Sequence, residues 1–267
     1  MELPIYQVDA FTSRLFGGNP AAVVPLERDW LADSVMQNIA AENNLAETSF
    51  FIPDGEERWK LRWFTPNLEI DLCGHATLAA AHVIFQHIDR SAAKAVFETR
   101  SGELVVTRDA ATGMLAMDFP ARPPEPCAVD SRLKQALGGK PLQVLASERD
   151  YLVTYKTEAD IAALAPDMRE LGHMDRFAVI VTAPGKDVDF VSRFFAPKAG
   201  VDEDPVTGSA HCTLIPYWAA RLGKQNLTAR QISKRIGELS CELRGSRVRI
   251  AGHTVEYLRG TIKLQQG

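Results

Sequence analysis

The sequence has little that would mark a membrane, secreted or redox protein. No apolar run approaches the roughly 18 residues of a membrane-spanning helix, and the first residues lack the basic and apolar regions of a secretory signal. The chain has four cysteines, and no two are spaced as Cys-x-x-Cys, which argues against a zinc ribbon or a redox pair. We therefore expect a cytoplasmic protein with free thiols and no membrane partner.

The sequence also lacks a strong net charge and a phosphate-binding motif. The net charge is −4 with Lys and Arg scattered, so no nucleic-acid partner is expected. No Gly-x-Gly-x-x-Gly motif follows a predicted strand, and no P-loop motif is present. His75 and His82 are seven residues apart with Leu78 and Ala79 between them, a weak basis for a metal site. We expect neither a cofactor nor a metal.

The composition is that of a globular protein with a sizeable core. The chain has 267 residues, of which 46% are hydrophobic and 24% charged, enough for one large domain or two smaller ones. Strand-like patterns outnumber helical ones, and hairpins are more frequent than βαβ units, which predicts an α+β fold with mostly antiparallel sheets. Four prolines between Pro120 and Pro126 predict a boundary, with domains at 1–119 and 120–267.

Hydrophobic periodicity predicts the helices and leaves one long segment without a predicted element. Beyond the helix predicted at 208–222, the next predicted element is a strand at 238–243. The predicted helices cover residues 30–40, 75–87, 131–137, 158–164, 167–172 and 208–222.

The two halves repeat one arrangement. Each has a strand, an Arg-aromatic-Phe-x-Pro segment, an acidic loop and a Gly-x-Ala that opens a helix. The segments are 61–66 with 69–76 in the first half and 192–197 with 202–210 in the second. Such a match favours duplication over chance and predicts that both helix starts face one cleft.

A helix that begins at glycine offers free backbone N–H groups and the positive end of the helix dipole. Gly74 and Gly208 are two such starts, and each lets a ligand approach the backbone closely. Facing each other, they would form a slot for an anionic group such as a carboxylate.

Five side chains near these starts are candidates for the chemistry. Glu47 stands at the head of a predicted strand, and Asp204 precedes the second helix. His75 lies in the first turn of its helix, where burial and the dipole predict a mostly neutral ring. Thr207 is a plausible N-cap, and Cys73 is a possible nucleophile or base. Each also has a structural alternative: a strand-edge carboxylate, a packing histidine, a helix-start acid or a small buried residue.

At these residues the sequence resembles the PhzF family of phenazine biosynthesis-like proteins. The resemblance covers essentially the whole chain and depends on the combination of motifs. The matching segments are Val8–Phe11, Gly18–Val24, Asn44–Phe50, Arg62–Pro66, Glu69, Cys73–Thr77, Arg193–Pro197, Glu203–Ala210, Gly237–Leu239 and Arg249–Gly252.

The resemblance implies the diaminopimelate epimerase fold, in which two pseudo-symmetric domains each wrap a mostly antiparallel sheet around a central helix. It also implies a homodimer and a cofactor-independent proton shift with Glu47 as general acid/base. His75, Asp204 and Ser209 would orient a small carboxylate-bearing substrate beside Gly74, Gly208, Cys73 and Thr207.

Two other functions remain open at this point. One is an amino-acid racemase or epimerase in which Cys73 works with Glu47 or Asp204 as the opposing base. The diaminopimelate epimerases use two thiols, whereas this chain has Thr207 at the second helix start, which disfavours a two-thiol reaction. The other is a small-molecule-binding protein without catalysis. The phenazine branch of the family has a small residue without a thiol at the position of Cys73. The resemblance therefore does not identify the substrate.

Overall fold

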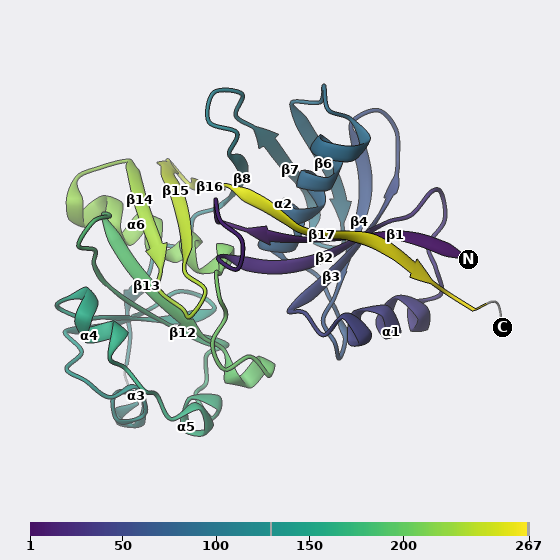
Figure 1. The fold of residues 1–267 in the computed structure, drawn as a ribbon. Coiled ribbons are helices and arrows are strands. Elements are labelled where there is room, and N and C mark those ends of the chain that lie inside the picture. The colour runs from purple at the N-terminus through teal and green to yellow at the C-terminus, as the bar shows by residue number, and fades with distance from the viewer. Residues whose placement is uncertain (129, 266–267) are drawn as a thin grey trace. The chain divides into compact units, whose positions relative to one another are not determined.

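The computed structural model describes residues 1–128 and 130–265 and has a sheet-dominated α+β fold (Figure 1). This confirms the predicted fold class. The helices are α1 (Asp33–Asn43), α2 (Gly74–Val83), the π-helix η1 (Ile84–Ile88), α3 (Ser131–Leu137), α4 (Glu158–Ala162), α5 (Met168–Gly172), the 3-10 helix η2 (Pro197–Ala199) and α6 (Gly208–Leu222). None of the helices in the described ranges is long and apolar enough to cross a membrane.

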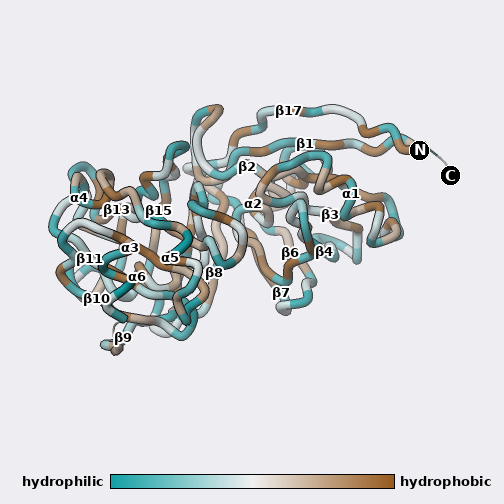
Figure 2. The backbone as a smooth tube through the Cα atoms, turned by 90° about the horizontal axis from the view of Figure 1, so that it is seen from below, coloured by the Kyte–Doolittle hydropathy of each residue, from teal (hydrophilic) through white to brown (hydrophobic). Residues whose placement is uncertain are grey.

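The strands mostly follow short alternating segments of the sequence. Figure 2 shows this alternation of hydrophobic and hydrophilic residues along β1. The strands are β1 (Glu2–Ala10), β2 (Asn19–Pro25), β3 (Glu47–Pro53), β4 (Arg58–Phe64), β5 (Glu69–Ile70), β6 (Lys94–Thr99), β7 (Gly102–Arg108), β8 (Leu115–Pro120), β9 (Glu125–Pro126), β10 (Gln143–Ala146), β11 (Asp150–Thr154), β12 (Ala178–Pro184), β13 (Phe190–Phe195), β14 (Asn226–Gln231), β15 (Gly237–Arg244), β16 (Arg247–Gly252) and β17 (Thr254–Lys263).

The chain divides into two compact units, and the division differs from the expected domain at 120–267. The first unit is Met1–Asp118 with the C-terminal segment that begins at Ala251, and the second is Phe119–Ile250. The C-terminal segment belongs to the first unit because β17 pairs antiparallel with β1 along its whole length. Residues 129, 266 and 267 of the expected second domain lie outside the described residues.

The first unit wraps strands around α2. From β2 the pairings run parallel to β3, antiparallel to β4, parallel to β6 and antiparallel to β7. Helix α2 packs against β1, β2, β3, β7 and β17. Eight of its ten residues are buried, which fits a helix enclosed by sheet on most sides.

The second unit repeats this order of pairings. From β11 they run parallel to β12, antiparallel to β13, parallel to β14 and antiparallel to β15. Helix α6 follows β13 in the chain, as α2 follows β4, and it contacts β14 and β15. Pro216 lies inside α6 and has no N–H to offer the carbonyl of Cys212 four residues earlier. That carbonyl instead accepts the backbone N–H of Arg122 at 2.8 Å.

The repeated Arg-aromatic-Phe motif has the same geometry in both units. Arg62 forms a two-pronged pair with Glu69 at 2.7 and 2.8 Å, and Arg193 forms one with Glu203 at 2.7 and 2.9 Å. Each guanidinium also lies over the phenylalanine two residues later. Each arginine therefore ties the acidic loop before its helix to the preceding strand.

Candidate functional site

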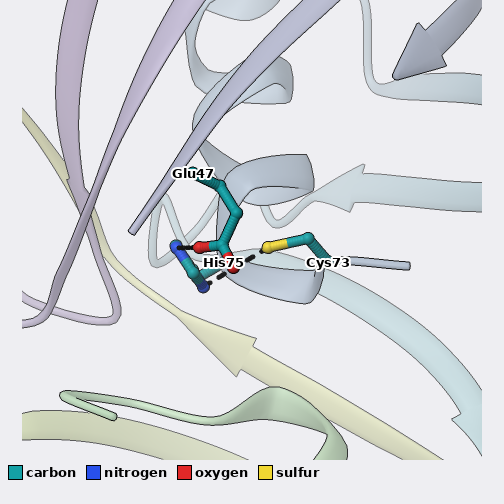
Figure 3. Close-up of side chains that lie close together, drawn as sticks. All are labelled: Glu47, Cys73 and His75. Carbon is teal, nitrogen blue, oxygen red and sulfur yellow. Dashed lines mark hydrogen bonds and ion pairs between the residues drawn. The ribbon is translucent and has the colours of Figure 1, made fainter. Parts of the chain in front are cut away.

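Glu47 and His75 form a buried ion pair at the start of α2. Glu47 is the first residue of β3 and His75 the second of α2. Glu47 Oε2 and His75 Nε2 lie 2.9 Å apart, with the side chains 15% and 6% exposed (Figure 3). Beyond this pairing, neither atom has a hydrogen-bond partner within the described part of the chain. Their main polar partners are therefore each other.

Cys73 completes this cluster from the other side of the imidazole. It occupies the N-cap position of α2 in an extended conformation, with φ −143° and ψ 112°. Its Sγ lies 3.5 Å from His75 Nδ1. The backbone is fixed there because the carbonyl of Cys73 accepts the Thr77 hydroxyl at 2.5 Å and the Thr77 N–H at 3.2 Å. The first turn of α2 thus holds thiol and imidazole on one side.

The charges in this cluster differ from the expectation for His75. Burial acts to lower the pKa of His75, but the neighbouring Cys73 and Glu47 outweigh it and raise the pKa well above its ordinary value. The prediction of a mostly neutral ring is therefore wrong, because it did not include the carboxylate at 2.9 Å. For Cys73, burial and then the charge of Glu47 raise the pKa to about 11, so the thiol keeps its proton at neutral pH.

Asn19 holds the imidazole from a third direction. Its side chain is fully buried, and Asn19 Nδ2 lies 3.2 Å from His75 Nδ1. Gly18 precedes it with φ +60°, and a Cβ there would lie 2.0 Å from the carbonyl oxygen of Ala10. Only glycine allows the turn that brings Asn19 to the ring.

The second unit builds a different cluster at the start of α6. The Thr207 hydroxyl donates to the Asp204 carboxylate. Thr207 occupies the N-cap position, as the sequence predicts. Its side chain does not cap the helix. Gln231, fully buried at the end of β14, accepts the Thr207 N–H at 2.9 Å and donates to the Asp204 carbonyl at 2.8 Å. Gln231 thereby joins the acidic loop to the helix start.

Arg149 adds a positive charge to this second cluster. Its Nη1 donates to Ser209 Oγ at 3.4 Å, and its guanidinium lies 4.1 Å from the centre of the Phe177 ring. Asp150 beside it is 1% exposed, and burial raises the pKa of its carboxyl to about 6. A cation, a hydroxyl and a helix N-terminus together suit an anionic group.

The structure brings the predicted residues together in two groups, one per unit. Sequence reasoning missed Gln231 and Arg149: β14 was not predicted at all, and neither residue lies in a recognisable motif. His82 is engaged elsewhere, since its Nδ1 lies 2.8 Å from Thr254 Oγ1. The first group contains Glu47, Cys73, Gly74 and His75, and the second contains Asp204, Thr207, Gly208 and Ser209.

Replacing Gln231 by leucine is expected to destabilise the protein by about 2–4 kcal/mol. The substitution leaves the Thr207 N–H and the Asp204 carbonyl without their partner in a buried site. Chemical denaturation of Gln231→Leu would measure the loss. The matched control is Asn226→Leu, an exposed amide on the same strand, for which a change within about 0.5 kcal/mol is expected. Equal losses in the two variants would contradict a supporting role for Gln231.

Comparison with known proteins gives one consistent result. Residues 8–260 match the PhzC-PhzF family, described as phenazine biosynthesis-like protein. An uncharacterised isomerase of Pseudomonas aeruginosa is 53% identical over 264 residues, 99% of this chain and 100% of the relative. An uncharacterised isomerase of Halalkalibacterium halodurans is 43% identical over 270 residues, 99% of this chain and 100% of the relative. A PhzF-family crystal structure from Enterococcus faecalis superimposes with a TM-score of 0.95 at 45% identity, covering 99% of this chain and all of the other.

Proposed function

The chain belongs to the phenazine biosynthesis-like PhzC-PhzF family and is an isomerase, and from this premise we propose that it catalyses a cofactor-independent proton shift. The substrate is a small carboxylate-bearing metabolite, and Glu47 is the general acid/base. Glu47 takes a proton from one carbon of the substrate and returns it to another, so the substrate keeps its composition. General acid–base catalysis of this kind contributes about 10²- to 10⁴-fold in rate.

One observation carries this assignment: Glu47 Oε2 lies 2.9 Å from His75 Nε2 in a nearly buried pair. The imidazolium balances the carboxylate in its proton-accepting form and holds one of its oxygens in place. The other oxygen is then available to the substrate. The N-terminus of α2, with Gly74 at its first position, supplies N–H groups and a dipole for the substrate's anionic group.

The protonation of Cys73 favours Glu47 over the thiol as the base. A racemase of the two-base kind needs a thiolate to remove a proton. Because burial and then Glu47 raise the pKa of Cys73 to about 11, the neutral thiol predominates at physiological pH. The thiol is thus a poor base in the resting cluster, which leaves the Glu47 carboxylate as the base of this proposal.

The second unit completes the proposal as the substrate-orienting half. Asp204 is held by Thr207 and Gln231, which would suit it to bind a substrate amine or hydroxyl. Ser209 and Gly208 open α6 and would bind a carboxylate. That the two helix starts serve one substrate remains part of this proposal, as do the homodimer and the cytoplasmic location.

Incorporation of solvent deuterium tests the proposal. The protein is incubated in D₂O with a panel of small cyclic and acyclic carboxylic acids, and mass spectrometry follows the gain of one mass unit. A proton-shifting isomerase is expected to label at least one acid at a non-acidic carbon without added cofactor. A broad panel on which the folded protein labels nothing, although it binds members of the panel, would contradict the proposed chemistry and favour a binding protein.

A further inference from the structure

The cluster at the start of α2 carries three different metal-ligating groups. Glu47, Cys73 and His75 offer a carboxylate oxygen, a thiol sulfur and an imidazole nitrogen. One ligand atom from each lies within 4.8 Å of the other two, and Cys73 and His75 are buried. Figure 3 shows the three side chains turned toward one another from β3 and the first turn of α2.

The distances are close to those of a tetrahedral zinc site. Zinc–sulfur bonds of about 2.3 Å and zinc–nitrogen bonds of about 2.0–2.1 Å place the two ligand atoms about 3.5 Å apart. Cys73 Sγ and His75 Nδ1 are 3.5 Å apart. A carboxylate oxygen within 4.8 Å needs to shift by only about 1 Å to become the third ligand.

The two nitrogens of the His75 ring have different neighbours. Nε2 is paired with Glu47 Oε2 at 2.9 Å, whereas Nδ1 lies 3.5 Å from Cys73 Sγ. The His75 side chain is 6% exposed, and the Asn19 amide holds its ring in place. A cation bonds only one nitrogen of the ring, and Nδ1 is the one beside the thiol, so the Glu47 carboxylate turns an oxygen toward that side to complete the site.

From this geometry we propose that Glu47, Cys73 and His75 form a binding site for a borderline-soft divalent cation of the Zn²⁺ type. The thiol and the imidazole select zinc over magnesium and calcium, which prefer oxygen ligands. Three protein ligands leave a fourth position for water, as in zinc sites that exchange ligands. The bound cation occupies the two side chains that the proton shift needs, so Zn²⁺ is a reversible inhibitor of the isomerase.

Only the inhibition rests on the proposed function, because binding is measured without turnover. Zn²⁺ itself is the probe, in competition with a chromogenic chelator. The expected result is one Zn²⁺ per chain and no competition from millimolar Mg²⁺. X-ray absorption of the complex should show one sulfur at about 2.3 Å with nitrogen and oxygen neighbours.

Three substitutions assign the ligands. Cys73→Ser and Glu47→Gln are each expected to weaken Zn²⁺ binding by at least about tenfold, since even supporting residues of metal sites cost 10- to 100-fold. Cys127→Ser, which removes a half-buried thiol outside the cluster, should bind as the wild type does. Circular dichroism without metal checks that all variants are folded. Absence of stoichiometric binding, or wild-type affinity in Cys73→Ser or Glu47→Gln, would overturn the three-ligand site.

Discussion

Glu47→Gln is expected to lower the rate of solvent-proton exchange into the substrate by about 10²- to 10⁴-fold. Glutamine keeps the size and one oxygen of the side chain but cannot take up a proton at neutral pH. The rate is measured by deuterium incorporation with whichever acid the wild type labels. Glu42→Gln, an exposed carboxylate in α1, is the control and should retain full activity. Wild-type exchange by Glu47→Gln would remove Glu47 as the proton carrier.

The same variant should lower the pKa of His75, which can be followed without a substrate. Burial acts to lower this pKa, and Cys73 and Glu47 raise it. Without the carboxylate charge, burial is opposed only by the contact with Cys73, whose thiol is protonated at neutral pH, so the pKa should fall toward or below its ordinary value of about 6.5. An NMR titration of the labelled imidazole measures the shift. A pKa unchanged from wild type would contradict the ion pair.

This pair also predicts how stability depends on pH. The folded pKa of His75 is raised, so its stabilisation is fully present below the unfolded pKa of about 6.5 and is lost as pH rises through the folded pKa. In Glu47→Gln this pH-dependent contribution should shrink. Denaturation of both proteins across that pH window separates the pair from other titrating groups.

Much of the candidate site could be predicted because its signals are local. The glycines that open α2 and α6 follow acidic loops at matched positions, and Glu47 heads a short strand of buried residues. These features depend on residues within a few positions of one another. The positions of the helix starts are correspondingly close to expectation, whereas the grouping of Glu47 with His75 was expected only from the family resemblance.

The features that were missed depend on contacts between distant segments. Strand β14 has only Leu227 and Ala229 as buried apolar residues, too weak a pattern to predict a strand, and Gln231 gains its role from Asp204 and Thr207, 27 and 24 residues earlier. The charge of His75 depends on Glu47. The domain assignment of β17 depends on pairing with β1 at the opposite end of the chain.

Arg193→Met is expected to destabilise the protein by about 2–4 kcal/mol, somewhat less than the roughly 3–5 kcal/mol of a broken buried ion pair, because Glu203 is 21% exposed. Methionine fills a similar volume but leaves the Glu203 carboxylate without its ion pair. It also removes the bonds from Arg193 to the carbonyls of Ile161 and Leu164, at 3.0 and 2.9 Å. Urea denaturation, followed by fluorescence and circular dichroism, measures the change.

The duplicated motif supplies the matched control. Arg62→Met breaks the equivalent pair in the first unit, but Glu69 there keeps a second partner, Arg100, at 2.8 Å. The expected loss is smaller, about 1–2 kcal/mol, because the remaining carboxylate stays paired. Equal losses in Arg62→Met and Arg193→Met would show that the second partner contributes nothing.

A double variant separates the unpaired charge from the lost packing. In Arg193→Met, part of the cost is the desolvated Glu203 carboxylate, and replacing Glu203 as well removes that charge. Arg193→Met/Glu203→Met should therefore recover at least about 1 kcal/mol relative to Arg193→Met alone. Glu203 adjoins Asp204, so the loop loses its tie to β13 in both variants, and deuterium exchange into the substrate should be impaired in both. Recovered stability with restored exchange would show that the arginine stabilises the fold without positioning Asp204.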